Sequence, residues 1–453
     1  MGAFVRRRRV ARLLGGVRAR LGHRRRPLVH SGCKELEAGA CETDPFPVGG
    51  GGMIGMLMVA VAGLEVARLS NGIPVLIENR PGEDTIAFCA MLRTDGLSLD
   101  EAAGLEGVVA SWYSGTEALT LSRLRHLAAQ TGGELTIRTA ADRFVFAAQV
   151  PKESFGLLVS VLAELWLHPD LRKETVADGG RERKRIQLFG NEPLSIQIRS
   201  LARDLGWPEA VAPTGDERRV RAAYAKIFRP EAAVFAVVGD VNSDAVIERL
   251  NRSFGFWQGR VAGRLQAQGS PREKREAEVG AFVGARLVGP EVGSSELAPF
   301  LVGVTALMEG KGSVLGRTLR YERAVSYQFG TLEAVRGGRL EAILYAAFEP
   351  GAELQDGTLL EEIRRAAREL TEGDLTRAKA FLLSQVQFGR PGGPLGRSVP
   401  RGQVKPAEAA YSHGWWQLFG GGLGGRERLL EGIESATVSE VRDALLASAS
   451  GGA

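Results

Sequence analysis

The sequence predicts an α+β protein of two related domains, each an antiparallel-rich sheet covered by helices. Three observations support this fold class. From residue 64 onward, short apolar strands alternate with segments whose apolar residues recur at helical spacing. The order of strands followed by pairs of helices occurs twice along the chain. A polar stretch between the two runs, residues 259–280, is rich in Gly, Gln, Lys and Arg, which is typical of a linker.

The first domain is predicted to span residues 64–258. An Asn71-Gly72 turn introduces its first long strand, and Gly132-Gly133 ends its second helix. The apolar segment Lys152–Leu167 has helical spacing and ends at His168-Pro169, because a residue before proline disfavours the helical conformation. The predicted strands are Ile73–Glu78, Thr85–Leu92, Glu134–Thr139, Arg143–Val150 and Ala232–Val238. The predicted helices are Ala102–Tyr113, Leu119–Thr131, Lys152–Leu167, Arg172–Phe189, Ser195–Leu205, Glu217–Phe228 and Ser243–Phe254.

The second domain is predicted to span residues 281–453 and to be shorter at its end. Its strands are expected at Ala281–Leu287, Ser326–Leu332 and Leu340–Phe348. Its helices are expected at Glu296–Met308, Val314–Glu322, 352–370, 373–388 and Val438–Ala447. No segment corresponds to the strand Ala232–Val238 of the first domain. The pair Trp415-Trp416 is interpreted as core or interface aromatics rather than as a ligand platform.

Residues 1–63 are predicted to be a disordered, Arg/Gly-rich extension. Residues 1–34 carry ten arginines, Lys34 and no acid, a charge of +11, so the remaining residues carry −6 of the formal net charge of +5. A mildly acidic body gives no electrostatic reason to expect nucleic-acid binding. The extension up to residue 52 could be a mitochondrial presequence, but a non-structural segment or a start codon placed too early is the favoured interpretation.

The compartment is not fixed by the sequence. Met53–Ala62 has the length of a signal-peptide core and is too short to cross a bilayer, but a buried strand running into Leu64–Leu69 explains the same residues. A cytoplasmic or periplasmic location fits a bacterial source, and mitochondrial import is less favoured. Cys33, Cys41 and Cys89 are too few for a disulfide framework or a zinc ribbon in the folded part, and Cys89 is predicted to be a small core residue.

Several short motifs occur in the order and spacing of one known family. The segment Ala103–Thr116, AGLEGVVASWYSGT, resembles the helix G-L-x-H-x-x-E-H followed by G-T of the insulinase/mitochondrial-processing-peptidase family of zinc peptidases. The flanking matches are Leu69–Ile73, Gly132–Leu135, Pro169, Val238–Val241, Gly312–Leu315, Leu319-Arg320 and Tyr327. The resemblance covers about residues 64–390 and implies the two-domain fold of that family.

The zinc ligands of the family are absent at the matching positions. Two histidines at i and i+4 share one helix face and can ligate one zinc ion, while the glutamate before the second polarises the attacking water. This chain has Gly107, Ala110 and Ser111 at these positions, and Lys184–Leu188 where the resemblance places the distal glutamate. No metal or other cofactor is therefore expected in this chain, and zinc is expected in a partner.

The resemblance assigns substrate contacts to the second half instead. In the family, an arginine and a tyrosine seven residues apart hydrogen-bond the substrate backbone, and Arg320 and Tyr327 match them. Gly310 and Gly312 match the glycine loop; with Lys311 they do not have the spacing of a phosphate-binding loop, and a flexible turn over the cavity mouth is expected.

The resemblance thus implies the non-catalytic subunit of a heterodimeric metallopeptidase. A zinc-bearing homologous partner would cleave unstructured peptides, and this chain, unable to hydrolyse peptides alone, would contribute substrate-binding groups. The alternative is a structural scaffold subunit, like the core proteins of a respiratory complex. Neither nucleic acid nor an integral membrane segment is expected, and the identities of substrate and partner are not encoded in recognisable form.

Overall fold

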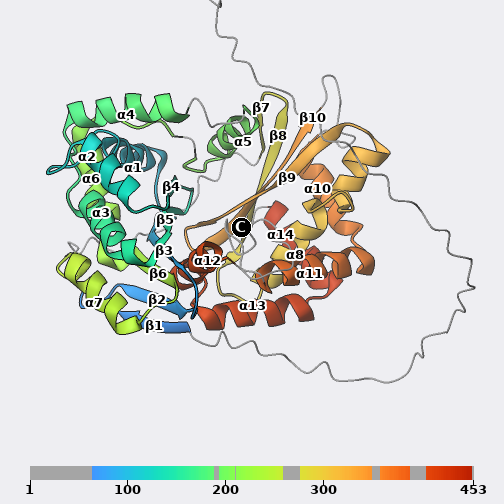
Figure 1. Cartoon of the computed structure of the whole chain (residues 1–453). Helices are drawn as coiled ribbons and strands as arrows, with labels where there is room; N and C mark the ends of the chain where they lie inside the picture. Colours follow the sequence, from blue (N-terminus) through green and yellow to red (C-terminus); the bar gives the residue numbers. More distant parts are fainter. Residues whose placement is uncertain are drawn as a thin grey trace, which may run out of the picture. The chain divides into compact units, whose positions relative to one another are not determined.

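The computed structural model describes residues 64–187, 193–209, 211–258, 276–348, 358–387 and 405–450. The predicted N-terminal extension, with Cys33 and Cys41, lies outside them. The described elements form two sheets with their helices (Figure 1), which confirms the predicted fold class. None of the helices in these residues combines the length and the hydropathy needed to cross a membrane.

The first sheet has six strands in the order β1-β2-β6-β3-β5-β4. Only β2 and β6 pair in parallel, with Val75 opposite Phe235, and all other neighbours are antiparallel. The strands are β1 Leu64–Arg68, β2 Pro74–Asn79, β3 Thr85–Arg93, β4 Glu134–Thr139, β5 Arg143–Pro151 and β6 Ala233–Gly239. The helices of this half are α1 Leu99–Ser111, α2 Leu121–Gln130, α3 Phe155–Leu167, α4 Lys173–Gln187, α5 Pro193–Asp204, α6 Glu217–Ile227 and α7 Ser243–Phe254.

One face of the first sheet is buried under helices of its own half. Alternating strand residues such as Phe88, Phe144 and Phe235 join a cluster that includes Trp166 of α3 and Phe254 of α7. Their rings meet edge-on or tilted with centroids 5.0–6.3 Å apart, the arrangement that aromatic quadrupoles favour. Cys89 points to the opposite face and is 1% exposed, so it is a core residue as predicted.

The second sheet has four antiparallel strands in the order β7-β8-β10-β9. They are β7 Glu276–Val279, β8 Phe282–Glu291, β9 Ser326–Arg336 and β10 Arg339–Phe348. The helices of this half are α8 Leu297–Met308, α9 Val314–Gly316, a π-helical turn Arg317–Glu322, α10 Leu359–Arg368, α11 Glu372–Gln387, α12 Pro406–Leu418, α13 Leu423–Ser435 and α14 Val438–Ser450. Among the described residues, no strand corresponds to β6.

Each sheet is covered on its other face by a helix from the opposite half (Figure 1). Helix α12 packs on β3 and β6 of the first sheet, where Gly414 lets the backbone approach Met91. Helix α5 packs on β7 and β8 of the second sheet, where Leu201 lies over Gly284. The contact between α5 and β8 leaves no room for a methyl group, because a Cβ at Gly284 would lie 2.6 Å from Leu201 Cδ2.

Buried polar groups also join the two halves. Glu78 of β2 lies 2.7 Å from His413 Nε2 of α12. The carboxylate of Glu341 accepts a hydrogen bond from Trp207 Nε1 at 2.8 Å and pairs with Arg286 at 3.0 Å. An unpartnered buried charge is costly, so these contacts fix how the halves meet.

Most predicted elements lie within a few residues of the observed ones, and three expectations need correction. The predicted linker 259–280 ends too late, because β7 occupies Glu276–Val279. Helices α12 and α13 were not predicted. The predicted helix Val314–Glu322 is one α-helical turn followed by a π-helical turn. The domain boundaries remain predictions, since residues 60–453 form one compact unit by contacts.

The contact between Glu78 and His413 predicts how the free energy of unfolding depends on pH in the acid range. Burial raises the pKa of Glu78, but hydrogen bonds from His413 and Arg80 outweigh it and lower the pKa to about 2. Because the folded-state pKa is lowered, the ionised carboxylate stabilises the fold above about pH 4.5, and this contribution is lost as the pH falls toward 2. We expect His413→Gln to lower the free energy of unfolding at pH 7 by about 2 kcal/mol and to flatten its dependence on pH between 4.5 and 2. Urea denaturation at several pH values measures both effects.

The control is Arg80→Gln, which removes the more exposed partner. The Arg80 side chain is 26% exposed and that of His413 is 10% exposed, so the loss should be smaller. Equal losses in the two variants would contradict the role given to His413.

Candidate functional site

Helix α1 carries the three positions that match the zinc motif. A capping box starts the helix: Ser98 accepts a hydrogen bond from the Glu101 backbone, and the Glu101 carboxylate accepts one from the Ser98 backbone. Gly107, Ala110 and Ser111 are all buried. The Ser111 hydroxyl donates to the Val108 carbonyl at 2.8 Å, within its own helix.

The space that a metal site would need is taken up by two neighbouring helices. A Cβ atom at Gly107 would lie 2.6 Å from Val220 Cγ2 of α6 and 3.2 Å from the Thr214 carbonyl oxygen. On the other side, a Cβ at Gly179 of α4 would lie 1.9 Å from the Ala110 carbonyl oxygen. The backbones of α1 and α4 therefore touch at the very position where the motif would place its glutamate.

Zinc does not fit these residues. None of the three side chains offers a nitrogen or carboxylate ligand. Within the described ranges, no three His, Cys, Asp or Glu side chains form a group that could hold a metal ion. Of the predicted distal stretch Lys184–Leu188, Lys184 is exposed, and Leu188 lies outside the described residues.

An ion pair stands beside the lost ligands. Glu106 is paired with Arg183 of α4 and also accepts a hydrogen bond from Thr139 of the edge strand β4. The Glu106 and Arg183 side chains are 13% and 16% exposed, so the pair is mostly shielded from water. It connects α1, α4 and β4 beside the three positions that match the zinc motif.

Arg320 and Tyr327 come together on the second half. The Arg320 guanidinium carbon lies 5.4 Å from the centre of the Tyr327 ring and 5.6 Å from that of Tyr321. Tyr327 is 52% exposed and Tyr321 62% exposed. The predicted pair is thus close in space, and no hydrogen bond or ion pair within the described part of the chain uses the Arg320 guanidinium N–H groups.

Three backbone irregularities shape this segment. Arg320 lies in the π-helical turn Arg317–Glu322. Ala324 has φ 53°, in the left-handed region that non-glycine residues avoid. Tyr327 is the extra residue of a β-bulge, because Ala347 pairs with Gln328 and Phe348 with Ser326. Such features are concentrated at functional sites, where they redirect side chains at a cost in stability.

A buried ion pair anchors the same segment. Arg323, between the π-helical turn and β9, pairs with Glu362 of α10, which is 0% exposed and also pairs with Arg365 at 2.5 Å. Burial raises the pKa of Glu362, but the two arginines outweigh it and lower the pKa. The carboxylate is therefore ionised and holds Arg323 inward, while Arg320 is half-exposed and Tyr327 is exposed.

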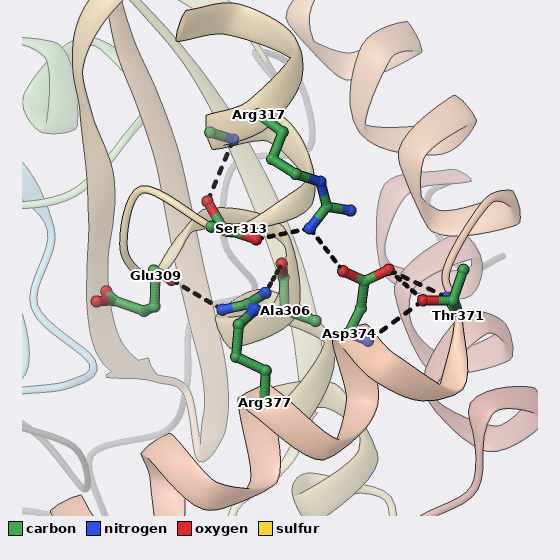
Figure 2. A network of polar contacts seen from close by, with 9 residues as sticks. Ala306, Glu309, Ser313, Arg317, Thr371, Asp374 and Arg377 are labelled. Atoms are coloured by element: carbon green, nitrogen blue, oxygen red, sulfur yellow. Dashed lines mark hydrogen bonds and ion pairs between the residues drawn. The ribbon is translucent and has the colours of Figure 1, made fainter. Parts of the chain in front are cut away.

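The glycine loop lies between two arginine contacts (Figure 2). Arg377 of α11 donates to the carbonyls of Ala306 and Glu309 at 2.9 and 3.1 Å, before the loop. After it, Arg317 donates to the Gly312 carbonyl at 2.7 Å and pairs with Asp374 at 2.9 Å. Gly310 has φ 78°, which explains a glycine there. The loop is thus fastened to α11 and leads directly into the turn that carries Arg320.

Sequence reasoning missed three contributors to these regions: Tyr321, the Glu106–Arg183 pair and the contact at Gly179. The only available signal was Gly179-Gly180 inside a predicted helix, because two helical glycines are costly unless a close approach requires them. The ion pair depends on residues 77 positions apart, which no local pattern connects.

The chain is similar to known proteins in part of its sequence and in its fold. Residues 216–382 match the family model described as the peptidase M16 inactive domain. The fold matches a protease from Helicobacter pylori, with TM-score 0.65 and 13% identity over 84% of this chain and 95% of that one. It also matches the peptidase M16 inactive domain from Pseudomonas fluorescens, with TM-score 0.61 and 16% identity over 85% and 95%. A protein from Alicyclobacillus acidocaldarius described as an M16-like peptidase gives TM-score 0.63 and 13% identity over 84% and 94%. By sequence, no curated protein matches the chain.

The α1–α4 contact predicts opposite effects at two adjacent glycines. Gly179→Ala places a methyl group against the Ala110 carbonyl and should lower the free energy of unfolding by about 2–3 kcal/mol. At Gly180 the nearest atom to a Cβ, Pro213 Cγ, is 3.9 Å away. Gly180→Ala should therefore raise the free energy of unfolding by about 0.5–1 kcal/mol, because alanine is the better helix former. Chemical denaturation of the two variants measures the difference, and similar values for both would refute the contact.

The left-handed conformation of Ala324 predicts that glycine is preferred there. Ala324→Gly should raise the free energy of unfolding by about 0.5–1 kcal/mol, since the steric cost of a Cβ at positive φ exceeds the entropic cost of glycine. Ala324→Val should lower it, because β-branching makes positive φ worse. Thermal melting of the variants tests the order Gly > Ala > Val, and any other order contradicts the assigned conformation.

Proposed function

We propose that this chain, which belongs to the insulinase-type (M16) peptidase family and lacks its zinc motif, is the non-catalytic subunit of a heterodimeric metallopeptidase. The observation that supports this most strongly is a contrast between its halves. The region that matches the zinc motif is filled by helix packing at Gly107 and Gly179, whereas the half-exposed Arg320 lies against the exposed ring of Tyr327.

Arg320 and Tyr327 are proposed to hold the substrate backbone. A guanidinium and a phenol are hydrogen-bond donors suited to a peptide carbonyl or to the oxyanion that develops during hydrolysis. No described residue forms a hydrogen bond or ion pair with the Arg320 guanidinium, so its donors are available to a ligand. The ionised Glu362 binds Arg323 instead and leaves Arg320 free of it.

Two edge strands support binding of an extended peptide. In the described sheets β4 and β9 are terminal strands, each paired on one side only. An unfolded peptide can add to such an edge through main-chain hydrogen bonds. On β9, the Val335 amide is already taken by Asp142 Oδ2 at 3.0 Å, so the end near Tyr327 is the better candidate.

The proposal assigns the hydrolytic step to the partner chain and the binding of the peptide backbone to this chain. Peptide hydrolysis in this family needs a metal-bound water and a glutamate, and this chain has no residue for either at the matching positions Gly107, Ala110 and Ser111. A zinc-bearing homologous chain would supply both, and this chain would orient the peptide across from them. The partner, its zinc and the shared substrate are parts of the proposal.

The test is reconstitution with the zinc-bearing homologue from the same source. Cleavage of an unstructured peptide that carries a fluorophore and a quencher reports turnover. We expect none from this chain alone and turnover from the mixture. Arg320→Ala should lower kcat/KM about ten- to a hundredfold and Tyr327→Phe about tenfold, because each removes a donor used in the transition state.

Arg368→Ala is the matched control, since Arg368 is an exposed arginine of α10 in the same half. It should leave kcat/KM unchanged. If the partner cleaves equally well without this chain, or if the Arg320 and Tyr327 variants have wild-type kcat/KM, the proposed role is wrong. A stable complex without any peptidase activity would favour the structural scaffold.

A further inference from the structure

Tyr321 is an exposed aromatic residue that the motif resemblance does not include. Its side chain is 62% exposed and belongs to none of the hydrophobic clusters of the described residues. Its ring lies 5.6 Å from the Arg320 guanidinium carbon, almost as close as that of Tyr327 at 5.4 Å. Arg320 therefore has two aromatic neighbours, one from its own helical turn and one from β9.

Contacts of this kind hold a cation without using its hydrogen-bond donors. The attraction is between the positive charge and the electron-rich faces of the rings, so the five guanidinium N–H groups remain free to bind a ligand. Two rings also restrict a long side chain that would otherwise lose rotamer freedom on binding. The neighbouring acid, Glu322, is exposed and forms no ion pair with Arg320 in the described structure.

A positive, preorganised guanidinium that pairs with no described residue favours one class of ligand group. A backbone carbonyl offers a single oxygen and no charge, so the backbone contact proposed above uses only part of the five donors of Arg320. A carboxylate offers two oxygens in the plane of the guanidinium fork and a negative charge, which gives the stronger, bidentate contact. Arg323, the other arginine of this segment, is already paired with Glu362 and cannot compete for the ligand.

We infer that Arg320, Tyr321 and Tyr327 form a subsite that binds a carboxylate on a bound peptide, with Tyr321 as a further positioning residue. The inference deepens the proposed function and rests on it for the statement that the ligand is a peptide. It adds a substrate class: peptides with an Asp or Glu side chain at the position that reaches Arg320. A partner protein that used this surface would be a different outcome of the test.

The experiment uses the isolated full chain, so it is independent of any partner. The probes are fluorescein-labelled, C-terminally amidated unstructured peptides, each with one Glu placed at successive positions, and the same peptides with Gln. Fluorescence anisotropy gives Kd for each pair. We expect at least one position at which Glu binds about tenfold more tightly than Gln, with the preference decreasing as salt is raised.

Three variants assign the preference to the subsite. Arg320→Gln should abolish the preference for Glu. Tyr321→Leu should reduce it to about two- to threefold, and Tyr321→Phe should retain it, because phenylalanine keeps the ring face and loses only the hydroxyl. Tyr321 is exposed, so the fold should persist in all variants, and circular dichroism with thermal melting checks this.

Equal binding of Glu and Gln peptides at every position, or no binding of any probe at millimolar concentration, overturns the inference. A Tyr321→Leu variant with the wild-type preference removes Tyr321 from the subsite. Variants that weaken only the complex with the zinc-bearing chain assign the surface to that interface and also overturn the inference. A retained Glu preference without turnover in the reconstituted pair would mean that the proposed function fails while the subsite stands.

Discussion

Each sheet of this protein depends on a helix from the opposite half to cover one of its faces. Helix α12 covers the first sheet and α5 covers the second, and both crossings have a glycine where backbone and side chain meet closely. Without this exchange, strand residues such as Met91 and Ile343, both 0% exposed, would face water. Burial of apolar surface is the dominant stabilising term, so neither half can expose its sheet without losing much of the stability of the fold.

Buried polar contacts then fix the position of the covering helix on the sheet. Glu341 is 1% exposed and binds both Trp207, which follows α5, and Arg286 of β8. Such a group adds little net stability when it is satisfied and costs several kcal/mol when a partner is missing, so alternative arrangements of the helix are penalised. Because α5 and the second sheet are locked in this way, β9 and the segment that carries Arg320 have a defined position relative to the rest of the structure.

The sequence predicts the elements whose pattern is local and misses those that depend on tertiary contacts. Strands such as Glu134–Thr139 and helix Ser243–Phe254 have clear periodicity and turn signals, and they were predicted with their observed bounds. Helix α12 packs on a sheet and on α13, so it has no polar face to give a periodic pattern. Strand β7 is four residues with two glutamates, and it is a strand because β8 pairs with it. For the site, the proximity of Arg320 and Tyr327 was predicted from a motif, but the position of Tyr321 and the bulge depend on the π-helical turn and on how β9 pairs with β10, which no local pattern predicts.

The absence of zinc ligands in α1 and the close packing of this helix involve the same positions. A histidine at position 107 would collide with Val220, and a bulkier residue at 179 would collide with the backbone of α1. The small residues at positions 107 and 179 allow α4 and α6 to approach α1, and the Glu106–Arg183 pair stabilises the approach of α4. Introducing the motif residues at positions 107, 110 and 111 would require α1 and its neighbouring helices to move apart. The contacts that now hold these helices together would then be lost. The segment Arg320–Tyr327 shows the opposite relation, because its π-helical turn, positive φ and bulge cost stability and yet leave the rings of Tyr321 and Tyr327 exposed. The first region is thus stabilised by close helix packing, whereas the second keeps backbone strain beside an exposed Tyr327, and the proposed role rests on this contrast.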